Sequence, residues 1–99
     1  MPSYKLTNKA VEDLSDIWNY TFDNWSEKQA DKYYKILLDH FAEISENQKI
    51  GKNYNGITNH LFGFKTGRHI IFYRILDKDF VEITRILHEK MDLKNRIND

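Results

Sequence analysis

The four histidines, His40, His60, His69 and His88, are the side chains best suited to hold a metal ion or to move a proton near neutral pH. Their spacing does not match that of zinc ligands, and the sequence contains no cysteine and no HExxH motif. We therefore predict no metal site and no cofactor. His69 and His88 lie close to basic residues and are the candidates for general acid–base chemistry, with ordinary surface histidines as the alternative.

Basic side chains are concentrated in the second half of a chain whose formal net charge is zero. Residues 1–50 carry six lysines and nine acidic residues, whereas residues 51–99 carry nine basic and six acidic ones. No acidic residue occurs from Asn47 to Leu76. If adjacent strands gather these cations, they form a modest basic surface for an anionic partner; a solvated face without a partner is the alternative. The residues expected to form it are Lys65, Arg68, Arg74 and Arg85. Zero net charge argues against strong direct binding of nucleic acid.

The composition is that of one folded domain, residues 1–99. Hydrophobic residues make up 40% of the chain and fourteen residues are aromatic, which is enough to form a core. No window approaches the roughly 20 apolar residues of a membrane span, and residues 1–5 lack the apolar run of a signal peptide. We expect a cytoplasmic protein without disulfides.

Two amphipathic helices are predicted after a short strand at Tyr4–Thr7. Thr7 or Asn8 can cap the first helix, whose apolar face recurs at helical spacing up to Trp25. A capping box at residues 26–29 starts the second helix, which continues to about Glu46. Together they predict a helical hairpin with one face directed at a sheet.

The second half of the chain predicts strands joined by short turns. The expected strands are Leu61–Lys65, Arg68–Leu76 and Phe80–Leu87, and their short connections indicate an antiparallel meander. The middle strand is apolar on both faces, so it should be central and covered on both sides. A weak helix at Met91–Ile97 could cover the second face. The fold class is therefore α+β: a strand and a helical hairpin packed on an antiparallel sheet of about four strands, with a short C-terminal helix.

Local sequences in this order resemble one known family. They are Tyr4-Lys5-Leu6-Thr7, Ala10 with Glu12-Asp13-Leu14, Ile17-Trp18, Tyr20, Asn24-Trp25-Ser26, Gln29-Ala30, Gly51, Gly67 to Arg74, Ile83 to His88 and Asp92-Leu93. The chain resembles the ParE branch of the RelE/ParE toxins of bacterial type II toxin–antitoxin modules, which serve in plasmid stabilisation. The resemblance implies a cognate ParD-like antitoxin that wraps the toxin, and either a homodimer or a toxin–antitoxin hetero-oligomer.

The two branches of that family differ in their targets. The ParE branch is known for poisoning DNA gyrase, whereas the RelE branch cuts messenger RNA in the ribosome with a Lys/Arg cluster and a C-terminal Tyr. The strand arginine of RelE corresponds to His69 here, and the Tyr position falls near Leu93, which cannot transfer a proton. The missing side chains and the zero net charge favour the ParE branch.

Our first hypothesis is therefore a non-enzymatic toxin that inhibits DNA gyrase and replication. A ribosome-dependent messenger-RNA endoribonuclease of the RelE type is the alternative, and a degenerate toxin kept as a partner-binding scaffold is a third. The candidates for target binding and toxicity are Arg68, His69, Arg74, Arg85, His88 and Lys90. The candidates for antitoxin binding are Tyr20, Trp25, Tyr33 and Tyr34, with core packing as the alternative for each.

Overall fold

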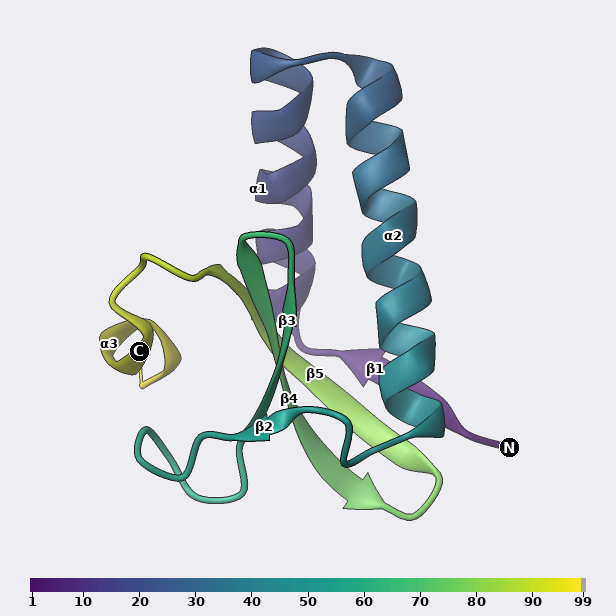
Figure 1. Cartoon of the computed structure of the whole chain (residues 1–99), viewed down its shortest axis with the longest axis vertical. Helices are drawn as coiled ribbons and strands as arrows, with labels where there is room; N and C mark the ends of the chain where they lie inside the picture. The colour runs from purple at the N-terminus through teal and green to yellow at the C-terminus, as the bar shows by residue number, and fades with distance from the viewer. Residues whose placement is uncertain (99) are drawn as a thin grey trace.

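The structure, a computed structural model, describes residues 1–98 and has an α+β fold (Figure 1). Two long antiparallel helices, α1 (Asn8–Asn24) and α2 (Glu27–Glu46), stand side by side and are followed by the strands of one sheet. A short helix, α3 (Leu93–Ile97), lies at the opposite end of the molecule from the N-terminus. The predicted fold class is confirmed. Within residues 1–98, no helix is both long and apolar enough to cross a membrane.

Both long helices begin where the sequence predicts. The Thr7 hydroxyl oxygen accepts a hydrogen bond from the Ala10 amide at 3.1 Å. The Ser26 hydroxyl oxygen accepts one from the Gln29 amide at 3.1 Å. Each bond satisfies an amide that the first turn of a helix leaves without a partner. Because only two residues separate the helices, α2 returns alongside α1.

The sheet has five strands in the order β1-β5-β4-β3-β2, one more than expected. The strands are β1 (Ser3–Leu6), β2 (Lys52–Asn53), β3 (Phe62–Thr66), β4 (His69–Asp77) and β5 (Phe80–His88). The last three form the predicted meander, but β1 pairs with β5 in parallel, so the sheet is mixed. The helical hairpin brings the chain back over the sheet and makes this parallel pairing possible. The short β2 had no apolar pattern that could reveal it.

The turn between β3 and β4 consists of Gly67 and Arg68. Gly67 has φ +57°, a left-handed conformation that favours glycine at the first position of a two-residue hairpin turn. The turn places His69 opposite Thr66 and starts β4 in register with both neighbours. It also leaves Arg68 exposed at the end of the hairpin.

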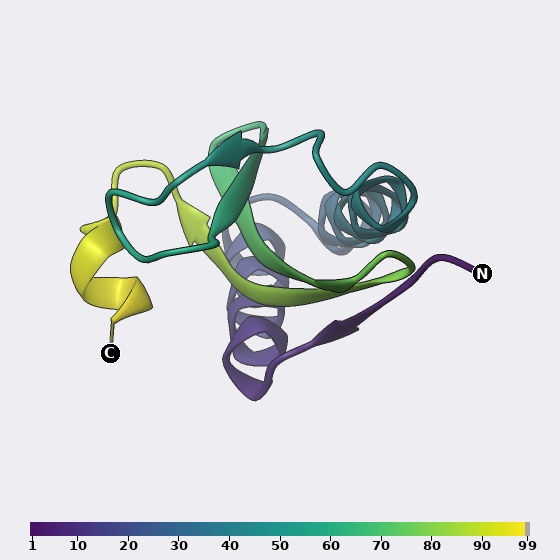
Figure 2. The ribbon, with the colours of Figure 1, turned by 90° about the horizontal axis from the view of Figure 1, so that it is seen from below.

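Side chains of β4 pack on both faces of the sheet, as predicted for a central strand. Ile71 and Tyr73 join the core beneath the helical hairpin, while Ile70 and Phe72 join a second cluster on the other face. That second cluster is covered by Leu93 and Ile97 of α3 and by Tyr54 and Ile57 of the loop between β2 and β3. Figure 2 shows the two long helices end on beside the twisted sheet, with α3 at its far end. The C-terminal helix therefore covers the second face of β4, as predicted.

The buried Tyr73 hydroxyl fixes the connection between α2 and β2. It donates a hydrogen bond to the Gln48 carbonyl at 2.7 Å and accepts one from the Gly51 amide at 3.0 Å. A Cβ at Gly51 would lie 2.7 Å from this hydroxyl and 2.8 Å from the Gly63 carbonyl oxygen. The close approach requires glycine at position 51.

Candidate functional site

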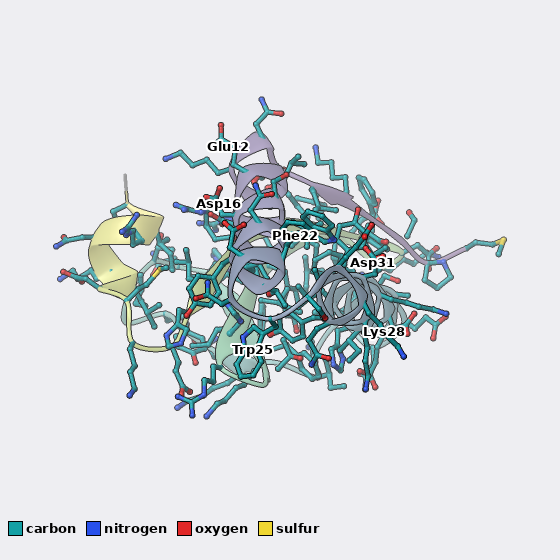
Figure 3. All side chains as sticks on the ribbon, turned by 90° about the horizontal axis from the view of Figure 1, so that it is seen from above. Glu12, Asp16, Phe22, Trp25, Lys28 and Asp31 are labelled. Atoms are coloured by element: carbon teal, nitrogen blue, oxygen red, sulfur yellow. The ribbon has the colours of Figure 1, made fainter. Side chains whose placement is uncertain are left out.

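A groove of about 880 Å³ lies between α1 and the C-terminal end of β5. One wall is the side of α1 that carries Asp13, Ile17 and Tyr20, at helical spacing. The facing wall is the end of β5 and the segment that follows it. Figure 3 looks onto the connection between the helices and shows Asp16 on the side of α1 nearest α3, with Trp25 at the end of that helix. The residues that line the groove are Asp13, Asp16, Ile17, Tyr20, Thr21, Trp25, Arg68, His69, Arg85, Ile86, Leu87, His88, Lys90, Met91 and Arg96.

Asp13 and Arg85 form a largely buried ion pair at one end of the groove. Arg85 Nε and Nη2 donate to the two carboxylate oxygens of Asp13 at 2.8 and 3.0 Å, and Arg85 Nη1 donates to the Arg96 carbonyl at 2.7 Å. The Ile86 amide also donates to Asp13, at 2.9 Å. The side chains are only 14% (Arg85) and 11% (Asp13) exposed. The pair joins α1, β5 and α3, so we assign Arg85 a structural role.

Two histidines face each other on β4 and β5 at the other end of the groove. His69 and His88 are paired in the register, and their ring centres are 5.5 Å apart. The Tyr33 hydroxyl lies 2.9 Å from His69 Nδ1. Burial lowers the pKa of His69 below its ordinary value and nearby His88 lowers it further, whereas Glu89 acts in the opposite direction. His69 is therefore a neutral ring at physiological pH.

Backbone contacts fix the orientation of His88. The Lys90 amide donates a hydrogen bond to His88 Nδ1 at 3.1 Å, so this nitrogen must carry a lone pair. In the neutral ring the proton is then on Nε2, which makes that nitrogen a donor. The adjacent Glu89 carboxylate pairs with Lys65 at 2.9 Å, and the hydrogen bond from Lys65 lowers the pKa of Glu89.

Exposed aromatic side chains and cations lie along the same groove. Tyr20 is 66% exposed and Trp25 is 74% exposed, which is unusual for large side chains without a partner. Arg68 and Lys90 are exposed, and within residues 1–98 neither side chain makes an ion pair with a carboxylate. The groove thus offers apolar contact and positive charge together.

The structure brings together most, but not all, of the predicted site residues. Five of the six candidates for target binding and two of the four candidates for antitoxin binding line the groove: Arg68, His69, Arg85, His88, Lys90, Tyr20 and Trp25. Tyr33 lies behind His69. Tyr34 lies apart, in a shallow hollow with Ser15, Trp18, Asn19 and Asp31.

The four cations expected to form one basic surface, Lys65, Arg68, Arg74 and Arg85, do not form a single patch. Arg68 and Arg85 line the groove, whereas Arg74 and Arg85 line a separate hollow. Arg74 shares a face of β4 with Phe72, away from the helical hairpin, and donates to the Asn59 carbonyl at 2.9 Å. Lys65 is neutralised by Glu89 and Arg85 by Asp13, two acids from outside the acid-free stretch. Among residues 1–98, Arg68 is the one of the four that lines the groove without an ion pair to a carboxylate.

Sequence reasoning missed Asp13, Asp16, Met91 and Arg96 as lining residues. Asp13 carries the clearest signal, because a carboxylate between Ala10 and Ile17 interrupts the apolar face of a helix. Such a carboxylate requires a cation beneath it. The contributions of Met91 and Arg96 depend on how the chain turns after β5, which no local pattern encodes.

The chemistry available in the groove is recognition of an anion and an apolar surface. No group of three or more metal-ligating side chains is close enough to hold a metal ion in the part of the chain that the structure describes. The donors Arg68, His88 and Lys90 can bind negative charge, while Tyr20 and Trp25 offer flat apolar surfaces. His69, His88 and the Tyr33 hydroxyl are also groups of the kind that transfer protons.

Comparisons with known proteins agree on one family. The family model described as "ParE toxin of type II toxin-antitoxin system, parDE" matches residues 4–93. Toxin ParE1 of Caulobacter vibrioides is 32% identical over 94 residues, covering 95% of this chain and 96% of the relative. Toxin ParE1 of Mycobacterium tuberculosis H37Rv is 29% identical with the same coverage. Toxin ParE of Escherichia coli is 28% identical over 99 residues, covering 100% of this chain and 96% of the relative.

A solved structure has the same fold. It is described as "Chromosomal ParDE TA system from P. aeruginosa" and superposes with a TM-score of 0.74 at 18% identity, covering 89% of this chain and 96% of that one. The family match over nearly the whole chain, and the relative at 32% identity, show that the chain belongs to the ParE toxins of type II toxin–antitoxin systems.

Proposed function

We propose that this ParE-family toxin inhibits DNA gyrase by binding it through the groove between α1 and β5, and that a ParD-like antitoxin neutralises it by covering the same surface. Gyrase acts on DNA in the bacterial cytoplasm, so the proposal places the toxin there. Gyrase inhibition is the activity implied by the ParE branch, and the groove of about 880 Å³ offers a surface on which a partner could bind.

One observation carries the proposal: a single groove is lined by exposed aromatic side chains and by cations that make no ion pair with a carboxylate of residues 1–98. An exposed Trp25 beside Tyr20, Arg68 and Lys90 has the composition of a protein interface, in which aromatic residues and arginine contribute most of the binding energy. An isolated domain gains no stability from keeping these side chains in water. A partner that covers them gains both apolar and ionic contacts.

A supercoiling assay tests the proposal. Purified toxin is added to gyrase and relaxed plasmid, and both loss of supercoiling and accumulation of cleaved DNA are measured. We expect inhibition by the wild type and a loss of at least about tenfold in Arg68→Ala or Lys90→Ala, because each removes an exposed contact. Arg74→Ala is the matched control and keeps full inhibition, since Arg74 lies outside the groove. Cognate antitoxin restores supercoiling.

The ribonuclease alternative is favoured by one arrangement, the contact of His69 with Tyr33 and His88. Cleavage of RNA needs a base for the 2′-hydroxyl and an acid for the leaving oxygen, and two histidines can fill these roles. A wild type that cleaves messenger RNA in translating ribosomes, and an inactive but folded His88→Ala, would support this alternative. The same result with gyrase supercoiling unaffected would overturn the first proposal. Normal growth of a host that expresses the toxin alone would support a degenerate scaffold.

A further inference from the structure

One end of the groove presents hydrogen-bond donors, and the nearby acids among residues 1–98 are paired with other cations. Arg68 and Lys90 are exposed there, and His88, the last residue of β5, lines the groove with them. The acids next to this end are already engaged: Glu89 pairs with Lys65, and Asp13 pairs with Arg85 farther along. The Glu89 carboxylate also interacts electrostatically with His88 and Arg68. The donors that remain at this end suit a ligand group that accepts hydrogen bonds and carries negative charge.

The ring of His88 is fixed as a donor by the backbone. Because the Lys90 amide occupies Nδ1, the neutral ring carries its proton on Nε2. His88 can thus donate to an oxyanion without becoming charged. The same assignment opposes a metal site at the two histidines, since metal binding requires a lone pair on the nitrogen that is protonated here.

The same groove also exposes two flat aromatic side chains. Trp25 is 74% exposed and Tyr20 is 66% exposed, and both line the groove together with Arg68. Phe22 is also exposed but stacks on Trp18, on the side of α1 nearer α2 and Asp31 (Figure 3). Aromatic platforms beside cations bind single-stranded nucleic acid, because every base can stack and every linkage carries a phosphate.

We propose that this groove binds a single strand of nucleic acid, with a phosphate held by Arg68, His88 and Lys90 and a base stacked on Trp25 or Tyr20. The site is local, so it is compatible with a net charge of zero. Affinity is set by a few contacts to a short strand and by stacking, without a field that extends over the whole surface. The proposal goes beyond gyrase binding and does not depend on it.

An acidic peptide is the competing occupant, and the groove favours the nucleic acid over it. Two of the largest exposed side chains are flat rings, which suit stacking of a base, and a chain of glutamates has no ring to place on them. Asp16 lines the groove one helical turn before Tyr20, so it opposes further negative charge from either occupant. The stacking surface is therefore the feature that favours a nucleic acid.

Fluorescence anisotropy of the purified full chain tests the proposal. The probes are labelled oligothymidylate and oligouridylate of about eight nucleotides, a length suited to one small site. An oligoglutamate of similar charge is the third probe. Titrations are repeated over a range of salt concentrations. DNA and RNA share the proposed chemistry, and the first two probes show whether the 2′-hydroxyl matters.

We expect saturable binding of at least one oligonucleotide that is weakened by Trp25→Ala by roughly 5- to 150-fold. Arg68→Ala and Lys90→Ala should each reduce the slope of log affinity against log salt by about 0.7 to 1. Phe22→Ala and Arg74→Ala are the matched controls and keep wild-type affinity. Circular dichroism of each variant confirms that it folds.

Three outcomes would overturn the proposal. They are absence of oligonucleotide binding at low salt, equal loss of affinity in Phe22→Ala and Trp25→Ala, and binding of oligoglutamate alone. Inhibition of gyrase by a toxin that binds no oligonucleotide would refute this inference and leave the proposed function intact. Oligonucleotide binding without gyrase inhibition would refute the proposed function and leave this inference intact.

Discussion

Replacing Arg85 should greatly lower the free energy of unfolding of this protein, although the residue lies in the candidate binding groove. Arg85→Ala removes two hydrogen bonds to Asp13, at 2.8 and 3.0 Å, and one to the Arg96 carbonyl at 2.7 Å. The Asp13 carboxylate, only 11% exposed, keeps the hydrogen bond from the Ile86 amide but loses its cation. Breaking a buried ion pair by removing one partner costs about 3–5 kcal/mol.

That loss is large relative to the stability of a small domain, which is about 5–15 kcal/mol. Urea unfolding followed by tryptophan fluorescence measures it. With a urea dependence of about 1–3 kcal/mol per molar, the midpoint should fall by roughly 1–5 M. Arg85→Lys should also be destabilised, but by less than Arg85→Ala. The lysine retains a positive charge, but its ammonium cannot donate two parallel bonds to a carboxylate and a third to a carbonyl.

Arg68→Ala is the control for this prediction. Arg68 is exposed and lacks an ion pair within residues 1–98, so its removal should change the free energy of unfolding by less than about 0.5 kcal/mol. If Arg85→Ala unfolds within about 0.5 kcal/mol of the wild type and still loses binding to the target, Arg85 belongs to the contact surface and our structural assignment is refuted.

Three further predictions concern the frame of the site. Tyr73→Phe loses the hydrogen bonds to the Gln48 carbonyl and the Gly51 amide, so urea unfolding should show a loss of about 1–3 kcal/mol; an unchanged midpoint would mean that water replaces the hydroxyl. Ser26→Ala removes the cap of α2 and should cost about 1 kcal/mol, with Ser26→Asp as the variant that restores it. The pKa of His69 is lower in the folded state than its ordinary value of about 6.5. Below about pH 6.5 the unfolded chain therefore binds more protons at this residue than the folded chain does. The free energy of unfolding should fall as the pH drops from about 6.5 through the lowered pKa. His69→Gln should flatten this part of the stability curve, and an unaltered curve would show that other groups cause it.

The elements that could be predicted from sequence are those encoded locally. The caps at Thr7 and Ser26, the apolar faces of the two helices and the two-sided strand at residues 70–73 depend on neighbours a few residues away. The parallel pairing of β1 with β5 was not predicted, because it joins residues about 77 positions apart and a four-residue strand has no pattern that specifies direction.

The site was predicted in part for a similar reason. Strand alternation places Arg74 on the opposite face from His69, but the register shift in β5 between the partners of Phe72 and Tyr73 makes the facing residues hard to deduce. The ion pair of Asp13 with Arg85 crosses 72 positions of sequence and changes a predicted binding residue into a structural one. Trp25 and Tyr20 could be identified as interface candidates but could not be placed beside His88 without the tertiary fold.

The pairing of β1 with β5 also determines at which stage of its synthesis the toxin can fold. Strand β1 and the helical hairpin leave the ribosome first, and they have no sheet to pack against until residues 80–88 have followed. The groove needs both α1 and the end of β5, so it is absent from a nascent chain. A ribosome therefore carries a chain without the groove for most of translation. Under the proposed function, an antitoxin already present in the cell can bind the groove as soon as it forms.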